Sequence, residues 1–340
     1  MGIDPKVQAR LEELQDGYLA TQLLYVAAQL GVADALAGGP RGGDVLAKEL
    51  GADPGFLRRV LRGLAALGVL DEHDGGTFGL TKVGELLRTG TPTSLRGPVL
   101  TRGAIYYRAL DHLLDGVRSG RTPFDLAHGT SFFDYLAARP AEQSAFQTSM
   151  TNRSKHEASA VVAAYDFDRF RRLVDVGGGQ GVLLSAILAA TPGLTGVLFD
   201  QPAVVESARP HLPPGCEVVG GDFFGELPAG ADAYLMSRVL HNCDDDDAIR
   251  ILRNCRNAMP DHATLLIVDT VLPERAADQP AAIRMDITML MLFAGRERTE
   301  SEHAALLAAA GLTLDRTIPT NSHAGVQIIE ARAQGTRPPA

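Results

Sequence analysis

The sequence predicts an α/β protein in two parts: a mainly helical N-terminal domain and a C-terminal domain built on a doubly wound, mostly parallel sheet. Two observations predict the sheet, namely a buried strand that runs into a glycine turn at residues 173–181 and the alternation of strand and helix patterns that follows it. Amphipathic helix patterns before residue 160 predict the helical part. A length of 340 residues exceeds one typical domain of about 100–200 residues and agrees with two.

Residues 1–100 form the expected N-terminal domain. Apolar residues fall at helical spacing over 7–36, and a helix, a turn and a second helix are expected at 44–50 and 53–61, with short strands near 68–70 and 77–80. This order is winged-helix-like, so a DNA-binding regulator that senses a small molecule is one interpretation. Such a domain should be basic, whereas residues 1–100 hold 10 Lys and Arg against 12 Asp and Glu. The charge therefore favours an interaction domain over a DNA reader.

Residues 101–160 are expected to be a helical connector that contributes to the active site. The stretch 122–156 is amphipathic, and Phe146 and Met150 are spaced to share one helix face. Their spacing agrees equally well with plain packing against the neighbouring domain. The sheet domain is expected at 161–332, and 333–340, with two prolines and a glycine, reads as a loose tail.

Strands of the sheet are expected in the following order: 172–176, 195–199, 216–220, 233–239 and 263–271, with a last pair at 312–318 and 325–331. Helix patterns between them imply crossover connections and a parallel sheet. In such sheets ligands bind beyond the carboxyl ends of the strands.

The glycine turn is expected to hold a nucleotide-like cofactor. Gly177, Gly179 and Gly181 follow the first strand, but a dinucleotide fingerprint would need a further glycine where the chain has Val182. An acid within the first strand, Asp175, and another at the end of the second, Asp200, resemble the pattern of S-adenosylmethionine methyltransferases. A carboxylate at the second position can accept both ribose hydroxyls. The alternative is an ordinary strand-to-helix turn without a ligand.

His241 follows the fourth strand, where it would project at the ligand edge. Imidazole is the side chain best suited to moving a proton near neutral pH, although a single histidine is usually structural. Four consecutive acids follow at 244–247 and resemble a metal cluster at first sight. Because a helix pattern begins directly after them, N-capping and the helix dipole explain them better. No metal is expected.

Composition excludes several classes of partner. A net charge of −9 argues against nucleic acid or an anionic membrane as the main ligand. No apolar run approaches the roughly 20 residues of a membrane span, and the N-terminus lacks a signal-peptide pattern, so a cytoplasmic protein is expected. The three cysteines, Cys216, Cys243 and Cys255, have no C-x-x-C spacing and predict neither disulfides nor a zinc site.

Residues 10–332 resemble the plant-type small-molecule O-methyltransferase family in its bacterial secondary-metabolism branch. The motifs that carry the resemblance are Val174-Asp175-Val176-Gly177-Gly178-Gly179-x-Gly181, Phe199-Asp200-x-Pro202, Gly221-Asp222-Phe223-Phe224, Val239-Leu240-His241 and Gly295-Arg296-Glu297-Arg298-Thr299-Glu300. The resemblance implies a class I, Rossmann-like S-adenosylmethionine-binding domain. It also implies a homodimer joined through the N-terminal, winged-helix-like domain.

The same resemblance assigns roles to individual residues. It implies a general base, His241, flanked by two acids, Asp269 and Glu297. Cofactor contacts are expected at Met150, Ser154, Asp175, Gly177, Gly179, Asp200, Gln201, Asp222, Phe223 and Ser237. The chain departs from the family at Asn242-Cys243, where relatives commonly have Asp-Trp, and at Ser237, where many have lysine.

The expected acceptor is a phenolic or otherwise hydroxylated aromatic metabolite. Three of the seven methionines lie just before Glu297, and flexible thioethers suit a flat guest, although core packing explains them equally well. The expected acceptor-binding residues are Phe146, Met285, Met289 and Phe293. An alternative keeps the fold but changes the chemistry to hydroxylation or decarboxylation of an aromatic polyketide; the base with its two acids argues against it.

Overall fold

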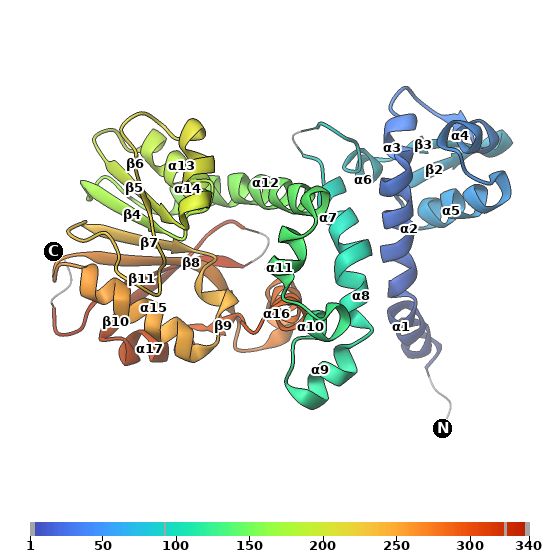
Figure 1. Ribbon diagram of the computed structural model, residues 1–340. Coiled ribbons are helices and arrows are strands. Elements are labelled where there is room, and N and C mark those ends of the chain that lie inside the picture. Colours follow the sequence, from blue (N-terminus) through green and yellow to red (C-terminus); the bar gives the residue numbers. More distant parts are fainter. Residues whose placement is uncertain (1–3, 92, 323–324, 337–340) are drawn as a thin grey trace. The chain divides into compact units, whose positions relative to one another are not determined.

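The computed structural model describes residues 4–91, 93–322 and 325–336. By contacts the chain divides into two compact units, one made of Met1–Asp111 and Phe133–Ser149, the other of His112–Phe132 and Met150–Ala340 (Figure 1). The long helix α12 (Pro140–Ala164) begins in the first unit and ends in the second. Each unit has its own hydrophobic core.

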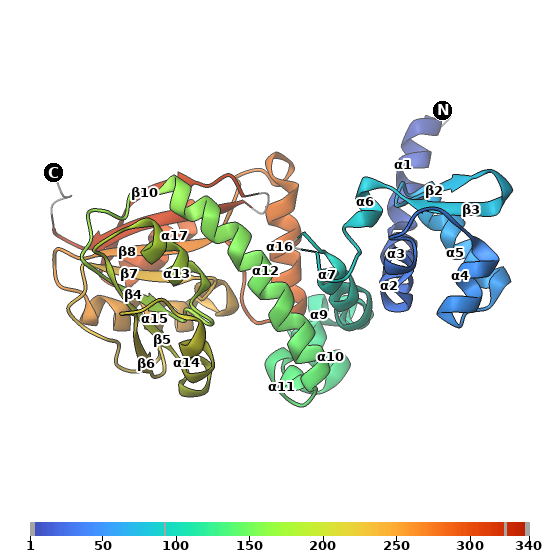
Figure 2. The ribbon, with the colours of Figure 1, turned by 90° about the horizontal axis from the view of Figure 1, so that it is seen from above.

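The first unit is mainly helical and carries a small sheet. Its helices are α1 (Pro5–Gln15), α2 (Gly17–Leu30), α3 (Val32–Ala35), α4 (Gly43–Leu50), α5 (Pro54–Ala66), α6 (Lys82–Glu85), α7 (Arg96–Thr101), a π-turn at Arg102–Tyr106, α8 (Tyr107–Leu110), α11 (Phe132–Ala137) and the start of α12. Three antiparallel strands pair in the order β1 (Arg41–Gly42), β3 (Thr77–Leu80), β2 (Leu70–His73). Figure 2 shows the β2–β3 hairpin beside α4 and α5, and the chain has the expected order of helix, turn, helix and two short strands.

Local sequence explains the ends of these helices. The carboxylate of Asp53 accepts a hydrogen bond from Phe56 N at 2.9 Å and caps α5, whose first residue is proline. The stretch 7–36, where apolar residues fall at helical spacing, is divided into α1, α2 and α3, because the chain turns at Asp16 and takes a left-handed conformation at Gly31, with φ of 76°. The strand expected at 68–70 begins only at Leu70, because Gly68 has a φ of 71°.

The second unit is built on one mixed sheet. The strand order is β10 (Leu312–Pro319), β11 (Val326–Ala333), β8 (Thr264–Leu272), β7 (Ala233–Ser237), β4 (Arg172–Val176), β5 (Thr195–Asp200), β6 (Glu217–Gly220), and the short β9 (Arg298–Thr299) pairs with β8. Neighbours from β8 to β6 are parallel, and β10 and β11 add an antiparallel edge. The carboxyl ends of β4, β5, β7 and β8 therefore meet at one edge of the sheet.

Both faces of this sheet are covered by helices, as the apolar strands require. Along β4, Val174 and Val176 face a core that includes side chains of α15 (Asp245–Ala258) and α17 (Glu300–Ala309). Leu173 faces the opposite core, which includes α12, α13 (Val182–Ala190) and α14 (Pro202–Ala208) (Figure 1). Successive side chains of each strand thus point to opposite faces of the sheet, and this decides on which face a side chain at the ligand edge lies.

The remaining segments of the second unit are α9 (Leu113–Ser119), α10 (Pro123–His128), α16 (Pro280–Leu292) and the 3-10 turns Arg209–His211, Leu240–Asn242 and Ala276–Asp278. Helices α10 and α16 are in contact, and α16 also contacts β8. Within the described ranges, no helix has both the length and the apolar character that crossing a membrane requires.

The strands lie within a few residues of the sequence prediction. The strand expected at 233–239 ends at Ser237, because Arg238 takes a left-handed backbone conformation with φ of 60°. Strand β11 extends to Ala333, into the expected tail, whose residues 337–340 lie outside the described part of the chain.

Candidate functional site

The glycine turn leaves β4 at Val176 and enters α13 at Val182. Gly177, Gly179 and Gly181 have φ values of 72°, 58° and 68°, a region that other residues rarely adopt. A Cβ on Gly177 would lie 2.7 Å from Cγ2 of Val239, which packs against the turn at this point, whereas a Cβ on Gly179 would meet nothing within 4 Å. The backbone of Gly179 is thus open to close approach by a ligand at the carboxyl end of β4.

Asp200 ends β5 and ties the turn to the next strand. Its Oδ2 accepts a hydrogen bond from Gly179 N at 2.8 Å, and its Oδ1 accepts one from Gln201 N at 2.7 Å. The carboxylate is therefore fixed beside the turn, in the position that suits recognition of ribose hydroxyls.

Asp175 lies beneath the turn and is 1% exposed. Neither of its carboxylate oxygens has a hydrogen-bond partner among the described residues. Burial, and next the charge of Asp200, raise the pKa of Asp175 to about 7. An unpartnered buried carboxyl next to a glycine-rich turn is what a cationic ligand group would complement.

The other expected cofactor residues are distributed around this edge. Asp222 follows β6, is exposed, and accepts a hydrogen bond from Phe224 N at 2.9 Å. Phe223 lies close to Gly177, because a Cβ built there would be 3.8 Å from its ring. Ser237 is the last residue of β7, and Met150 and Ser154 are half-buried on α12 in the same unit.

His241, Glu297 and Asp269 come together although they are distant in sequence. His241 lies in the 3-10 turn after β7, Asp269 in β8, and Glu297 just before β9. Nδ1 of His241 is 3.0 Å from Oε1 of Glu297 and 3.8 Å from Oδ1 of Asp269. All three are buried, at 7%, 1% and 1% exposed. An imidazole held at Nδ1 by a carboxylate is the arrangement of an oriented general base.

Asp269 is the less paired of the two acids. Its oxygens accept no hydrogen bond from the residues described, and burial raises its pKa to about 6, opposed by the charge of His241. The ligand atoms of the three groups lie within 4.8 Å of one another, so the cluster also has the size of a metal site. The absence of a metal remains a prediction. Of the acids at 244–247, Asp244 caps α15 by accepting from Asp247 N at 2.9 Å, as the sequence indicated.

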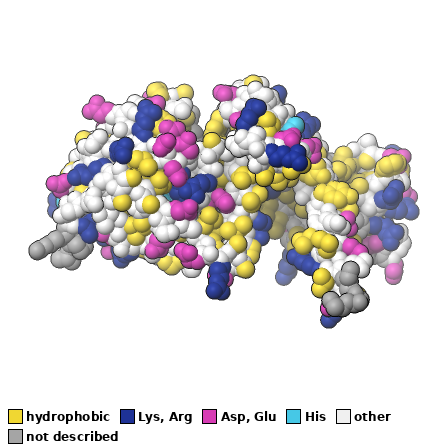
Figure 3. Space-filling model, turned by 90° about the horizontal axis from the view of Figure 1, so that it is seen from below, with side chains coloured by type: hydrophobic (Ala, Val, Ile, Leu, Met, Phe, Trp, Pro, Cys, Tyr) yellow, Lys and Arg dark blue, Asp and Glu magenta, His cyan; other side chains and the backbone are white. Residues whose placement is uncertain are grey.

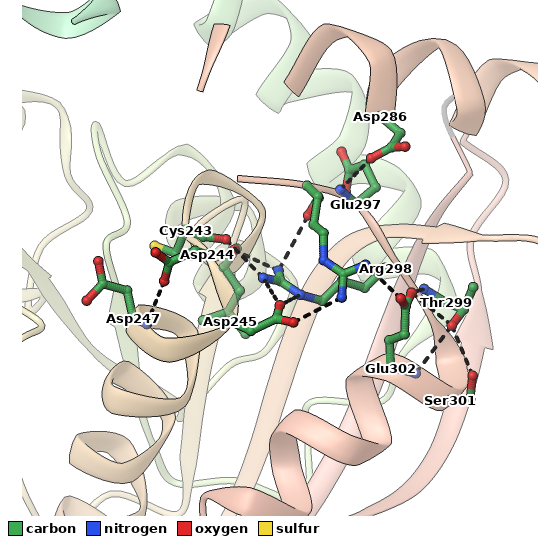
Figure 4. A network of polar contacts seen from close by, with 12 residues as sticks. Cys243, Asp244, Asp245, Asp247, Asp286, Glu297, Arg298, Thr299, Ser301 and Glu302 are labelled. Atoms are coloured by element: carbon green, nitrogen blue, oxygen red, sulfur yellow. Dashed lines mark hydrogen bonds and ion pairs between the residues drawn. The ribbon is translucent and has the colours of Figure 1, made fainter. Parts of the chain in front are cut away.

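A second cluster, which the sequence did not predict, holds the turn that carries His241 (Figure 4). The guanidinium of Arg298 is 1% exposed; it donates to the carbonyl oxygens of Leu240 at 3.0 Å and Cys243 at 2.9 Å and to the carboxylate of Asp245 at 2.8 Å. Figure 4 also shows Glu297, whose backbone N–H donates to Asp286 at 3.0 Å. The backbone on either side of His241 and the backbone of Glu297 are therefore held in place.

The expected acceptor residues are only partly brought together. Met289 is buried, Met285 and Phe293 are half-buried, and Met285 and Met289 lie on α16. Phe146 belongs to the other unit. Sequence reasoning missed Phe132, which is 1% exposed and packs edge-on against Phe293 with ring centroids 5.4 Å apart. Its presence in an aromatic-rich run, followed by Phe133, was the available signal.

Comparisons with known proteins identify related chains. The model of an O-methyltransferase domain matches residues 110–313, and that of an O-methyltransferase dimerisation domain matches residues 12–90. The chain is 45% identical to the phenazine O-methyltransferase PhzM of Lysobacter antibioticus, over 95% of both chains. It is 38% identical to the mitomycin biosynthesis 6-O-methyltransferase of Streptomyces lavendulae, over 95% of this chain and 93% of the other.

A solved structure extends the comparison to ligands. The O-methyltransferase NcsB1 from neocarzinostatin biosynthesis, in complex with S-adenosylmethionine and 2-hydroxy-5-methyl naphthoic acid, superposes with a TM-score of 0.81. The two chains are 33% identical, and the match covers 92% of this chain and 96% of that one. The class I fold and the helical N-terminal domain of the present chain are thus those of solved methyltransferases.

Proposed function

Because this chain belongs to the O-methyltransferase family, we propose that it transfers the methyl group of S-adenosylmethionine to a phenolic hydroxyl of an aromatic secondary metabolite, with His241 as general base. The observation that carries the proposal is the buried cluster of His241, Glu297 and Asp269. It lies at the same sheet edge as the glycine turn, because β4, β7 and β8 are parallel. The relatives named for phenazine, mitomycin and naphthoate chemistry support an aromatic acceptor.

The residues present fit S-adenosylmethionine. No side chain lies within 4 Å of the Cβ position of Gly179, Asp200 offers a fixed carboxylate for ribose, and Asp175 offers buried acceptors to a cationic group. The remaining residues proposed to contact the cofactor are Asp222, Gln201, Phe223, Ser237, Met150 and Ser154. When bound, the cofactor supplies an electrophilic methyl group on a sulfonium.

His241 accepts the proton of the acceptor hydroxyl. A carboxylate only accepts hydrogen bonds, so Nδ1 donates to Glu297 and Nε2 takes the proton. A phenol has a pKa of about 10 and an imidazole about 6.5, so the proton leaves as the methyl transfers rather than beforehand. Glu297 and Asp269 then stabilise the imidazolium. Most of the acceleration comes from positioning, which contributes about 7–11 kcal/mol in well-oriented reactions.

The side chains proposed to contact the aromatic acceptor within the second unit are Met285, Met289, Phe293 and Phe132. Their rings and thioethers offer apolar, polarisable contacts to a flat guest. Phe146, from the first unit, is proposed as a further acceptor contact on the family resemblance alone.

We propose that the protein is a homodimer joined through its N-terminal domain. Val7, Leu11 and Leu14 recur on one face of α1 and are 64%, 59% and 60% exposed. Figure 3 shows exposed hydrophobic side chains on the right of the view, the side on which Figure 1 labels α1 and α2. An apolar stripe of this kind is typical of a covered surface.

The function is tested by methyl transfer from labelled S-adenosylmethionine to a panel of phenols and matched arylamines. We expect wild type to methylate a phenol, and His241→Ala to lose most activity at neutral pH but to recover some as the phenol ionises at higher pH. His262→Ala, at a side chain that is 71% exposed, is the matched control and should keep full activity. Cofactor binding without methylation of any phenol, with His241→Ala indistinguishable from wild type, would refute the proposal.

A further inference from the structure

Arg238 has an unusual backbone at the end of β7, just before the turn that carries His241. Among the residues that the structure describes, it is the one non-glycine residue with positive φ, at 60°. Such a conformation is strained for a residue with a Cβ and persists only where its surroundings hold it. Here Asn242 Nδ2 donates to the Arg238 carbonyl oxygen at 2.9 Å, and Arg238 N donates to Val268 O at 3.1 Å.

With this backbone conformation, the guanidinium of Arg238 lies among buried acidic side chains. Its Nη2 and Nε donate to the two carboxylate oxygens of Glu157 on α12, at 2.7 and 3.3 Å. Its Nη1 donates to Oγ1 of Thr270 on β8 at 3.0 Å. The same Nη1 lies 3.7 Å from Oε1 of Glu297, the oxygen that pairs with Nδ1 of His241. The Arg238 side chain is 16% exposed and that of Glu297 is 0% exposed.

The charges around Arg238 come from every element packed against it. Glu157 faces it from α12, Asp269 from β8, and Glu297 from the segment before β9. The imidazole of His241 pairs with both Asp269 and Glu297. The charge of Arg298 lowers the pKa of Asp269. Buried carboxylates take up protons unless a cation is close, so the ionisation of this cluster depends on its cations.

We propose that Arg238 is a positioning residue for methyl transfer, which keeps Glu297 ionised and aimed at Nδ1 of His241 and ties that acid to α12 through Glu157. The inference rests on the proposed function, because it gives Glu297 its role through the base. A protonated Glu297 could not stabilise the imidazolium by charge. Arg238 itself touches neither the acceptor nor the reacting atoms in this assignment.

The test compares Arg238→Gln, which removes the charge and keeps hydrogen-bond donors, with Arg238→Lys, which keeps the charge. Removing a cation makes proton uptake by Glu297, Asp269 and His241 more favourable, so each becomes protonated at higher pH. The acidic limb of the kcat/KM profile should therefore move to higher pH in Arg238→Gln, by about 1 pH unit. It should stay in place in Arg238→Lys. A merely structural role would lower activity by the same factor at every pH.

Arg332→Gln is the matched control, because Arg332 forms a similarly buried ion pair with Asp315 on the β10–β11 hairpin, where both side chains are about 20% exposed. Its profile should keep the wild-type acidic limb. An unmoved limb in Arg238→Gln overturns the inference and leaves the proposed function intact. If Arg238→Gln does not fold, the test uses Arg238→Lys. A shift of the acidic limb of its kcat/KM profile then overturns the inference.

A second readout needs no turnover. Selective ¹⁵N labelling of histidine, with His241→Ala to assign the signal, follows proton uptake by His241 directly. The titration should move to higher pH in Arg238→Gln and not in Arg332→Gln. If wild type methylates no phenol, the proposed function fails, while this titration still decides whether Arg238 controls the cluster.

Discussion

The backbone of Gly295 packs directly against the carbonyl group of His241. A Cβ at residue 295 would overlap the His241 carbonyl oxygen and would lie 2.7 Å from Cα of Asn242. Because these atoms are backbone, no side-chain rotation relieves the overlap, and the turn that carries the base would have to move. The glycine that begins the Gly295–Glu300 motif thus lets the segment of Glu297 approach the turn of His241.

Gly295→Ala should therefore lower kcat by about 100-fold, the cost of a misplacement near 1 Å. The affinity for S-adenosylmethionine should change little, because the glycine turn at Gly177 is not touched. Calorimetric titration of the cofactor and steady-state kinetics measure the two quantities separately. Gly38→Ala, where a Cβ meets nothing within 4 Å, is the control. An unchanged kcat in Gly295→Ala would contradict the packing argument.

Arg298→Met should destabilise the protein, because it leaves the carbonyl oxygens of Leu240 and Cys243 without their buried donor. The expected loss is about 2 kcal/mol in the free energy of unfolding, measured by urea denaturation. Arg296→Met is a sharp control: Arg296 also pairs with Asp245 but is 43% exposed, so its loss should stay below about 1 kcal/mol. Equal losses in both variants would show that the exposed ion pairs dominate.

The sequence supplied the fold class and the family, and the comparisons confirm both. Hydrophobic alternation and the glycine turn located the strands within a few residues, since both signals are local. The predicted end of β7, at residue 239, was wrong. Val239 and Leu240 continue an apolar run in the sequence, and only the left-handed backbone of Arg238 interrupts the strand. Asn, Asp and His are the non-glycine residues enriched at positive φ, so an arginine gives no signal of it in the sequence.

Residues that act through long-range contacts escaped prediction. Arg298 reaches Leu240, and Arg238 reaches Glu157, from positions 58 and 81 residues away in sequence. An arginine in a sequence gives no sign of whether its guanidinium is solvated or buried, and the tertiary fold alone decides this. The same holds for Phe132 at the start of α11, whose ring contact with Phe293, directly after α16, joins segments far apart in the sequence.

Asp175→Asn should stabilise the protein in the absence of cofactor at neutral pH. Burial raises the pKa of Asp175 from 3.8 to about 7, so the folded state binds the proton more tightly than the unfolded state does. The stability that this group contributes is therefore fully present below about pH 4 and is lost as pH rises to about 7. The free energies of unfolding of Asp175→Asn and wild type should differ by up to about 4 kcal/mol at pH 7.5 and by almost nothing at pH 4.

Thermal unfolding across this pH range measures the difference. Asp71→Asn, at an exposed side chain in the other unit, is the control and should follow wild type throughout. If Asp175→Asn tracks wild type at every pH, Asp175 is not desolvated as the structure has it. The same variant should bind S-adenosylmethionine more weakly, because Asp175 is proposed to face a cationic group of the cofactor.

Leu14→Asp should weaken the proposed homodimer. Leu14 is 60% exposed on α1, in line with Leu11 and Val7, and a two-fold interface contains each substitution twice. Losing about 2 kcal/mol of leucine burial per copy gives about 4 kcal/mol, or roughly 1000-fold in the dissociation constant. Sedimentation velocity over a dilution series measures this shift. Val45→Asp, at a 55% exposed residue on α4, introduces the same charge outside the stripe and should leave the dimer intact. If both variants dissociate alike, added charge rather than this stripe controls assembly; if neither does, the stripe of α1 is not the interface.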